Sequence, residues 1–229
     1  MPINREIIKE INDLNSSKNQ KINLVAVTKN RTIDEIKSLV SLGIKNIAEN
    51  KIQEAEKKYI ELNNKENFFK KNNVKFHFIG HLQKNKVKKA VLMFDVIQSV
   101  DSYELAFEIN KKASLLNKIQ EIFIQVNIGK EKQKKGIEKE NLFFLIEKIK
   151  EMQNLKLNGL MCIAPFFDDN KKTRPYFREM KELFDKTNKI LLKKRKKIEF
   201  LSMGMTSDYK IAIEEGSNMI RIGRGLFAD

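Results

Sequence analysis

The chain of 229 residues contains one cysteine, two histidines, three prolines and no tryptophan. A single thiol, Cys162, excludes an intrachain disulfide, and its place in the apolar run LNGLMCIAP indicates a buried, unreactive side chain. Two histidines are too few for a histidine-rich transition-metal site, so we expect no bound metal. The sequence also lacks a linker rich in Gly, Pro or Ser, and we predict one domain spanning residues 1–229.

Long apolar runs are absent as well. No stretch approaches the length that crosses a bilayer, and the charged, amphipathic opening MPINREIIKEINDLNSS lacks the apolar centre of a signal peptide. Hydrophobic residues nevertheless make up 41% of the chain, which is enough to bury a sizeable core. We therefore expect a soluble, globular, cytoplasmic protein with no membrane partner.

The charge of the chain is strongly unbalanced. Lys and Arg number 45 against 30 Asp and Glu, and the resulting net charge of +15 attracts anionic partners. Most of the excess is lysine that alternates with apolar residues at helical spacing, as on solvated helix faces. The denser runs, KNKVKKA at 84–90 and KKRKK at 193–197, lack interleaved aromatic residues that could stack on bases. Specific nucleic-acid binding is therefore the least favoured function.

Short β-branched runs alternate with amphipathic helical stretches along the whole chain. The expected strands are 23–28, 44–48, 75–79, 95–100, 121–128, 156–163, 198–203 and 219–223. Helix signals lie between them. Thr32 and Glu35 form a capping-box pattern, Gly43 marks the end of the same helix, and Asp101 or Ser102 caps the helix after the fourth strand.

This repeated order of strand and helix favours a parallel sheet, and eight units at this length favour a closed (β/α)8 TIM-like barrel. We expect a helix near residues 3–16 to cover the gap left by the missing helix after the last strand. A doubly wound open sheet is the alternative, because periodicity does not report closure. Two polar segments, 62–75 and 127–140, are predicted to be loop excursions.

The first expected strand ends in a lysine. In a parallel barrel the loops after the strands converge on one face, so Lys29, which follows the buried run LVAV, is expected at the barrel mouth. Burial there disfavours the ammonium form and makes the amine a better nucleophile toward an aldehyde. The alternative is an ordinary solvent-exposed loop lysine.

Glycine is scarce but gathers near the C-terminus. Gly204 follows the seventh expected strand in LSMGMTSDYK, and Gly223 and Gly225 follow the eighth in IRIGRGLFAD. The loops after strands seven and eight of such barrels commonly hold a phosphate on backbone N–H groups, although two tight turns would show the same pattern. Together with Lys29, these loops point to a phosphorylated aldehyde, and pyridoxal 5′-phosphate fits both parts.

Other polar residues fall at or near strand ends. Arg221 lies within the eighth strand, where it either faces inward and donates to a ring nitrogen or faces outward and pairs with a helix carboxylate. Glu49 and Asn50 follow the second strand. His77 lies in the third strand and His81 at its exit, although a strand histidine is commonly a hydrogen-bonded core residue.

Several motifs, taken in their order along the chain, resemble those of a known family. LVAVTK, AEN, FHFIGHLQKNK, NGLM, RPYF, LSMGMTSD and IRIGRGLF, from about residue 20 to the C-terminus, resemble the pyridoxal phosphate homeostasis proteins, whose barrel is similar to the N-terminal domain of alanine racemase. The resemblance implies that Lys29 forms a Schiff base with the cofactor, that Asn50 lies near its ring and that Arg221 faces the pyridine nitrogen. The residues matched to the phosphate are Ser202, Thr206, Gly223 and Arg224. We also include His77 among the expected cofactor-binding residues.

Some positions depart from the family pattern. Ala48 stands where the family usually has glycine before Glu-Asn, and Ala228 stands where glycine usually follows the phenylalanine. Arg224 and Gly225 replace a small hydroxyl residue followed by alanine. Arg224 would either add a charge-assisted contact to the phosphate or project into solvent while backbone N–H groups bind the phosphate.

The resemblance implies a binding protein rather than a catalyst. Arginine at the ring nitrogen keeps that nitrogen unprotonated and weakens the cofactor as an electron sink. A racemase also needs a second proton-transfer group opposite Lys29, which alanine racemases take as a tyrosine from an additional domain, and no tyrosine here is an obvious substitute. We expect a monomer that holds pyridoxal 5′-phosphate, contributes to its homeostasis and transfers it to apo-enzymes. A small amino-acid racemase is the alternative.

Overall fold

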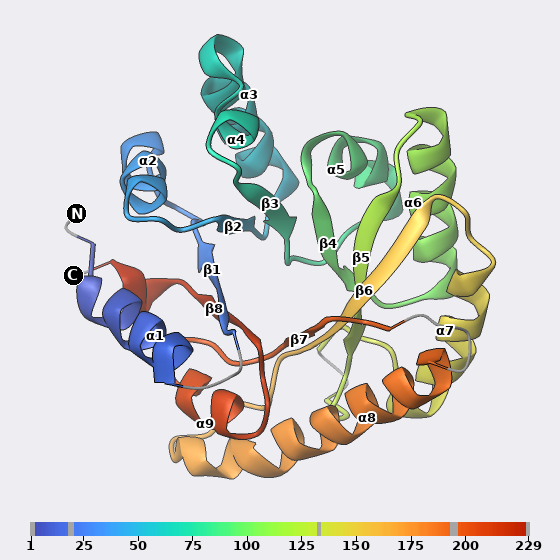
Figure 1. Ribbon diagram of the computed structural model, residues 1–229. Coiled ribbons are helices and arrows are strands. Elements are labelled where there is room, and N and C mark those ends of the chain that lie inside the picture. Colours follow the sequence, from blue (N-terminus) through green and yellow to red (C-terminus); the bar gives the residue numbers. More distant parts are fainter. Residues whose placement is uncertain (1–2, 18–20, 132–133, 193–196, 228–229) are drawn as a thin grey trace.

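The computed structural model describes residues 3–17, 21–131, 134–192 and 197–227 (Figure 1). Eight parallel strands form a closed barrel in chain order, with helices arranged around the outside of the ring. The last strand pairs with the first, from Asn23 opposite Met219 to Ala26 opposite Ile222. This pairing closes a sheet whose strands follow chain order and leaves no free edge, which confirms the predicted (β/α)8 barrel rather than an open sheet.

The strands begin and end within two residues of their predicted limits. They are β1 (Asn23–Val27), β2 (Asn46–Glu49), β3 (Lys75–Phe78), β4 (Val96–Val100), β5 (Gln120–Val126), β6 (Leu155–Cys162), β7 (Phe200–Ser202) and β8 (Met219–Ile222). The helices are α1 (Arg5–Ser17), α2 (Ile33–Ser41), α3 (Ile52–Glu66), α4 (Phe68–Lys71), α5 (Val87–Met93), α6 (Tyr103–Leu115), α7 (Leu142–Lys150), α8 (Arg174–Leu192) and α9 (Tyr209–Glu214). Every helix in the described ranges is too short or too polar to cross a membrane.

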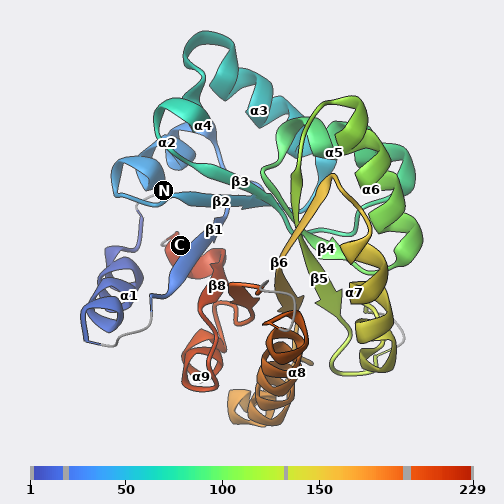
Figure 2. The ribbon, with the colours of Figure 1, turned by 45° about the vertical axis from the view of Figure 1, so that its right-hand side comes forward.

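Helix α1 lies beside β1 and β8, where a helix after the last strand would otherwise pack (Figure 2). Its Ile11 is buried, and its Glu10 carboxylate accepts a hydrogen bond from the Tyr209 hydroxyl at 2.8 Å. The N–H of Asn4 donates to the carbonyl of Leu226 at 2.9 Å. The two ends of the described chain are therefore joined, and the predicted role of the N-terminal helix is confirmed.

The structure contains capping contacts at the predicted limits of two helices. Thr32 accepts a hydrogen bond from the N–H of Glu35, and the Glu35 carboxylate accepts one from the N–H of Thr32, which completes the capping box. Gly43, just beyond α2, has a φ of +90°, a conformation that favours glycine. Ser102, rather than Asp101, caps α6 through its side chain.

Segment 62–75 differs from the predicted loop excursion, because most of it is helical. Helix α3 continues to Glu66, and α4 places Phe68 and Phe69 in the core. The ring of Phe69 stacks on that of Phe76 in β3, with the ring centres 4.8 Å apart. The asparagines of this segment suggest a loop, whereas the two phenylalanines anchor it to the barrel.

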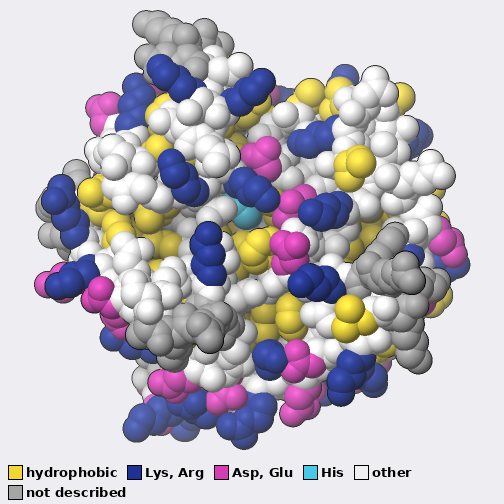
Figure 3. All heavy atoms as spheres, viewed as in Figure 1, with side chains coloured by type: hydrophobic (Ala, Val, Ile, Leu, Met, Phe, Trp, Pro, Cys, Tyr) yellow, Lys and Arg dark blue, Asp and Glu magenta, His cyan; other side chains and the backbone are white. Residues whose placement is uncertain are grey.

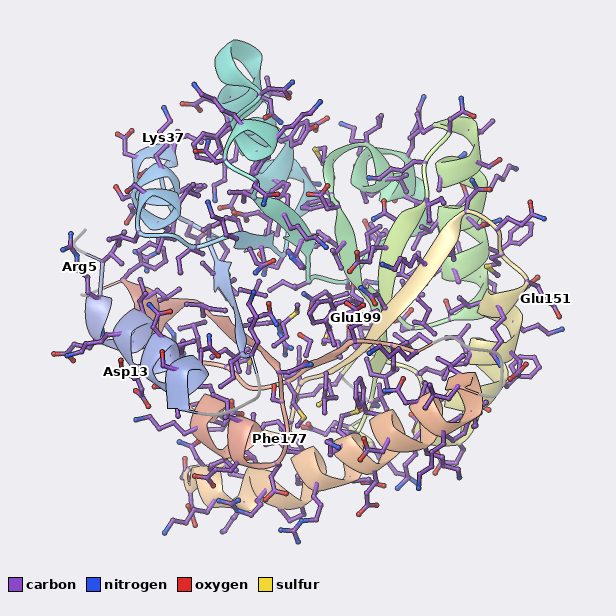
Figure 4. All side chains as sticks on the ribbon, viewed as in Figure 1. Arg5, Asp13, Lys37, Glu151, Phe177 and Glu199 are labelled. Atoms are coloured by element: carbon purple, nitrogen blue, oxygen red, sulfur yellow. The ribbon has the colours of Figure 1, made fainter. Side chains whose placement is uncertain are left out.

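Side chains fill the ring of strands, so the barrel is a packed core rather than a pore (Figure 4). The apolar part of the interior consists of Val25, Val27, Ala48, Val96, Phe123, Met161 and Met219. Glu199, which immediately precedes β7, lies near the middle of this view, so Figure 4 looks onto the amino ends of the strands. The opposite end, where the loops after the strands meet, faces away from the viewer.

The basic side chains are spread over the face of the molecule that Figure 3 shows. Figure 3 shows Lys and Arg side chains interspersed with Asp and Glu. Ion pairs form between such residues of the described chain, for example between Lys75 and Glu121 at 3.3 Å. The run at 84–90 occupies a short 3-10 turn and the start of α5. Residues 193–196 of the second dense run lie outside the described residues.

Replacing Phe69 by alanine tests the packing of segment 62–75. Phe69→Ala is expected to lower the free energy of unfolding by about 3 kcal/mol, because it leaves a cavity between Tyr59 and Phe76. Urea unfolding measures the change, and Phe144→Ala, at a side chain that is 63% exposed, is the control with an effect within about 0.5 kcal/mol. Equal losses in both variants would contradict the packing described here.

Candidate functional site

A cavity of about 640 Å³ opens at the carboxyl ends of the strands. It is lined by residues at the ends of seven strands or in the loops just after them, namely β1, β2, β3, β5, β6, β7 and β8. Its volume lies in the range of sites that hold small organic ligands. The cavity therefore lies where barrels of this architecture place their functional residues.

The charged groups around this cavity are cationic. The basic residues that line it are Lys29, His81, Lys134, Lys135, Arg221 and Arg224. No Asp or Glu side chain lines it within the described part of the chain. A site with several cations and no carboxylate favours an anionic ligand.

Lys29 reaches the cavity because the strand alternation continues past the end of β1. Val25 and Val27 face the barrel interior, and Lys29 is the next residue on that side. It sits in a turn in which the N–H of Arg31 donates to the carbonyl of Thr28 at 3.0 Å. No hydrogen bond or ion pair joins the Lys29 ammonium to another residue of the described chain.

The predicted burial of Lys29 is wrong, because the residue is exposed at the edge of the cavity. The strand ends at Val27, and the turn that follows lifts the lysine toward solvent. Thr28, whose side chain points out of the barrel, is the last fully buried residue of this segment. Lys29 nevertheless lies at the barrel mouth, which is the location predicted for it.

Arg221 is buried in the barrel interior and also lines the cavity, with 3% of its surface exposed. One terminal nitrogen donates to Ser202 Oγ at 2.8 Å, and the other donates to the carbonyl of Cys162 at 2.8 Å. No carboxylate of the described chain forms an ion pair with it, so the outward-facing alternative is wrong. Burial lowers the pKa of this guanidinium, and its remaining N–H donors are available to a ligand.

A chain of hydrogen bonds crosses the barrel from Arg221. Because a guanidinium only donates, Ser202 Oγ accepts from it and directs its own hydrogen to Gln98 Oε1, 2.7 Å away. The Gln98 amide then donates to Nδ1 of His77 at 2.9 Å. The remaining proton of His77 therefore lies on Nε2, which donates to Asn46 Oδ1 at 3.1 Å.

Two predicted site residues, His77 and Ser202, therefore lie below the cavity rather than in its wall. Both are buried, and neither lines the cavity. Ser202, which we expected near a phosphate, instead has its hydroxyl bonded to Gln98 and Arg221. Burial lowers the pKa of His77 to about 3, consistent with the neutral imidazole that the hydrogen-bond chain requires.

Asn50 lines the cavity just after β2. Its Oδ1 atom is buried and has no hydrogen-bond partner in the described part of the chain. Gly80 packs so closely against the Asn50 backbone that an added Cβ would lie 2.0 Å from the Asn50 carbonyl oxygen. Since buried polar atoms are normally paired, this amide has hydrogen-bonding capacity left for a ligand.

The loops after β7 and β8 meet at one side of the cavity. Thr206, Gly223 and Arg224, which the resemblance matches to positions around a phosphate, all line it. The N–H of Gly225 points to Thr206 Oγ1 at 3.4 Å, which brings the two loops together. Arg224 is exposed at the cavity edge, where its guanidinium is free to approach an anion.

The structure adds residues that sequence reasoning missed. Gln98 carries a signal that could have identified it, since it is a polar residue inside the apolar strand VIQSV and lies on the same side as Val96. Lys134 and Lys135 carry no such signal. They lie in a polar segment that is held beside the cavity by a bridge between Val126 and Ile137, by a hydrogen bond from Gln125 Nε2 to the Lys135 carbonyl and by one from Lys134 Nζ to the Ala164 carbonyl.

Comparison with known proteins places the chain in a family. Residues 6–229 match the family model described as alanine racemase, N-terminal domain. The pyridoxal phosphate homeostasis protein of Aquifex aeolicus (strain VF5) is 39% identical over 206 residues, covering 90% of this chain and 86% of the relative. The protein of the same name from Synechocystis sp. (strain PCC 6803) is 36% identical over 208 residues, covering 91% of each chain.

A solved structure gives the same result. PipY of Synechococcus elongatus PCC7942, with PLP bound, has a TM-score of 0.82 and 30% sequence identity, and the match covers 97% of this chain and 100% of PipY. The fold and cavity thus define a (β/α)8 barrel of the alanine racemase N-terminal-domain type. More narrowly, the chain belongs to the pyridoxal phosphate homeostasis protein family, as its motifs predicted.

The buried neutral His77 generates a prediction about pH. Its pKa in the folded protein, about 3, lies below the value near 6.5 of an unfolded chain, so the unfolded state binds the proton first. The resulting stability is complete above about pH 6.5 and is lost as the pH falls toward 3. Between pH 7 and pH 5 we expect wild type to lose about 2 kcal/mol more unfolding free energy than His77→Gln.

Urea unfolding at the two pH values measures this difference. Equal losses in wild type and His77→Gln would contradict a neutral buried imidazole. Nitrogen-15 NMR provides an independent check, because the hydrogen-bond chain requires the His77 proton on Nε2. The His77→Gln spectrum assigns the signals, since only His81 remains.

Proposed function

We propose that this protein holds pyridoxal 5′-phosphate reversibly as a Schiff base on Lys29 and contributes to the homeostasis of the cofactor without catalytic turnover. The observation that carries the proposal is the cavity itself. Within the described residues, it combines a lysine amine that has no protein partner, a buried guanidinium that has no carboxylate partner, and two glycine-containing loops side by side. The PLP-bound structure of the relative PipY, at 30% identity, supports the same ligand.

Pyridoxal 5′-phosphate supplies an aldehyde, a pyridine nitrogen and a phosphate when it is bound. Lys29 would lose its ammonium proton to solvent and so supply the neutral amine, Nζ, that condenses with this aldehyde. Such a condensation would form a C=N bond with release of one water molecule and would need no oxidant or reductant. Addition of water reverses the reaction, and the exposed position of Lys29 leaves the amine open to this exchange.

The other residues of the cavity match the remaining groups of the cofactor. In this proposal Arg221 donates to the ring nitrogen and the amide of Asn50 binds a polar ring substituent. Thr206, Gly223 and Arg224 hold the phosphate through a hydroxyl, a backbone N–H and a guanidinium. Ser202 and His77 act on the site through Arg221, by way of the hydrogen bonds described above.

Two features support the absence of turnover. A guanidinium at the ring nitrogen leaves that nitrogen unprotonated, which weakens the cofactor as an electron sink. The four tyrosines, which are all described, lie outside the cavity wall; they are Tyr59, Tyr103, Tyr176 and Tyr209. None of them is therefore placed as the second proton-transfer group of a racemase.

We extend the proposal to a monomeric, cytoplasmic carrier that transfers the cofactor to apo-enzymes that depend on it. The open cavity edge, where Lys29 and Arg224 are exposed, supports release as well as capture. The homeostasis proteins that match this chain over most of its length support the role in cofactor supply.

Absorbance spectroscopy with Lys29→Ala tests the proposal. Wild-type protein mixed with pyridoxal 5′-phosphate should develop a visible Schiff-base band that borohydride reduction fixes permanently to the protein. Lys29→Ala should lose both the band and the fixed product, because the condensing amine is gone. Lys37→Ala, an exposed lysine on α2, is the control and should behave as wild type. An unchanged spectrum in Lys29→Ala would contradict the assignment.

The alternatives have different signatures. A racemase would exchange the α-proton of an amino acid with solvent continuously, which proton NMR in heavy water detects. A nucleic-acid-binding protein would bind with a steep dependence on salt and would be insensitive to Lys29→Ala. Sustained proton exchange on any amino acid would overturn the proposed absence of turnover.

A further inference from the structure

A buried charged cluster lies directly behind the turn that carries Lys29. We call it the Lys58 cluster, and it consists of Thr28, Glu49, Glu54 and Lys58. Lys58 projects from α3 and is 8% exposed, whereas Glu49, at the end of β2, is completely buried. None of the four lines the cavity, so the function proposed above leaves them unexplained.

The ammonium group of Lys58 is fully used within this cluster. It donates to the Thr28 carbonyl at 2.6 Å, to Glu49 Oε1 at 2.8 Å and to Glu54 Oε1 at 2.6 Å. An ammonium group has three N–H donors, so these contacts satisfy all of them. Lys58 thus joins α3 to the end of β1 and to the end of β2.

The cluster anchors both neighbours of Lys29. Thr28 is held through its carbonyl by Lys58 and through its hydroxyl, which donates to Glu49 Oε1 at 2.7 Å. Asn30 is held through its N–H, which donates to Glu54 Oε1 at 2.5 Å. The φ of Asn30 is +59°, in the left-handed region that asparagine adopts more readily than most residues. The backbone of Lys29 is therefore fixed on both sides while its side chain stays unattached.

Stability alone does not account for this arrangement. Burying an ion pair costs desolvation energy that offsets most of the attraction, and apolar replacements of similar shape are often as stable. The second oxygen of Glu49, Oε2, is also buried and has no hydrogen-bond partner in the described residues. Burial accordingly raises the pKa of Glu49. The cluster costs desolvation energy and contacts the backbone on both sides of Lys29. Control of the geometry of the Lys29 turn explains it better than stability does.

We propose that Lys58 is a positioning residue whose three hydrogen bonds hold the Lys29 turn in the orientation that Schiff-base formation requires. The inference rests on the proposed function, because it assumes that Lys29 condenses with an aldehyde. Without Lys58, the Thr28 carbonyl and Glu54 lose their common partner, and the turn keeps only the hydrogen bonds of the Thr28 hydroxyl and the Asn30 N–H to carboxylates that are no longer held in place. Misplacement of a reacting atom by about 1 Å can reduce a rate by about a hundredfold.

Measurements with two ligands distinguish this positioning role of Lys58 from a general structural role. Pyridoxal 5′-phosphate reports condensation with Lys29, whereas pyridoxine 5′-phosphate has the same ring and phosphate but no aldehyde and reports only noncovalent binding. Lys58→Met should slow Schiff-base formation at least about tenfold. The same variant should bind pyridoxine 5′-phosphate with an affinity within about threefold of wild type, because the Arg221 and phosphate regions remain.

Lys57→Met is the matched control, since Lys57 is the adjacent residue on the same helix but is exposed. It should leave both measurements as in wild type. Because Lys58→Met leaves the Glu49 carboxylate buried without its cation, a second variant, Lys58→Met with Glu49→Gln, removes both charges together. Its thermal midpoint reports whether the fold is retained, and it should show the same selective loss of condensation.

The outcomes are distinct. Equal loss of both ligands in a folded variant would mean that Lys58 supports the whole site rather than the Lys29 turn, and would overturn the positioning role. Condensation at the wild-type rate in either folded variant would also overturn it while leaving the proposed function intact. If wild type itself gives no product fixed by borohydride, the proposed function fails, and the positioning role fails with it.

Discussion

The buried guanidinium of Arg221 is the group on which the rest of the site depends. Because it can only donate, its bond to Ser202 sets the direction of the hydrogen bonds that follow through Gln98 and His77 to Asn46. A cation at this depth without a carboxylate is costly unless other groups accept its hydrogen bonds. One part of the barrel interior is accordingly polar, whereas the other part is filled by an apolar cluster.

The alternation of strand residues separates the reactive groups from their support. On β1 and β2 the inward positions lead to Lys29 and Asn50, which line the cavity. The outward positions just before them, Thr28 and Glu49, belong to the cluster around Lys58. A shift of either strand by one residue would exchange the two sets. The register that closes the barrel therefore also decides which residues face the ligand and which ones hold the turn.

The parts of this structure that could be predicted from sequence are those encoded locally. Eight alternating units indicate the barrel, and the position of Lys29 after a buried strand places it at the mouth. The surroundings of Ser202 could not be predicted in this way, because its partner Gln98 lies 104 residues away in the chain. The exposure of Lys29 depends on the turn after Thr28, which strand periodicity does not describe. Long-range pairing and turn geometry thus account for the main differences.

Identification of the modified lysine tests the central claim most directly, because the chain has many other lysines on its surface. The protein would be mixed with pyridoxal 5′-phosphate, reduced with borohydride, digested and analysed by mass spectrometry. When the cofactor is added at up to one equivalent per protein chain, we predict that Lys29 is the single modified residue. Modification centred on Lys134 or Lys135, which also line the cavity, or spread over many lysines, would contradict the assignment of Lys29 as the binding group.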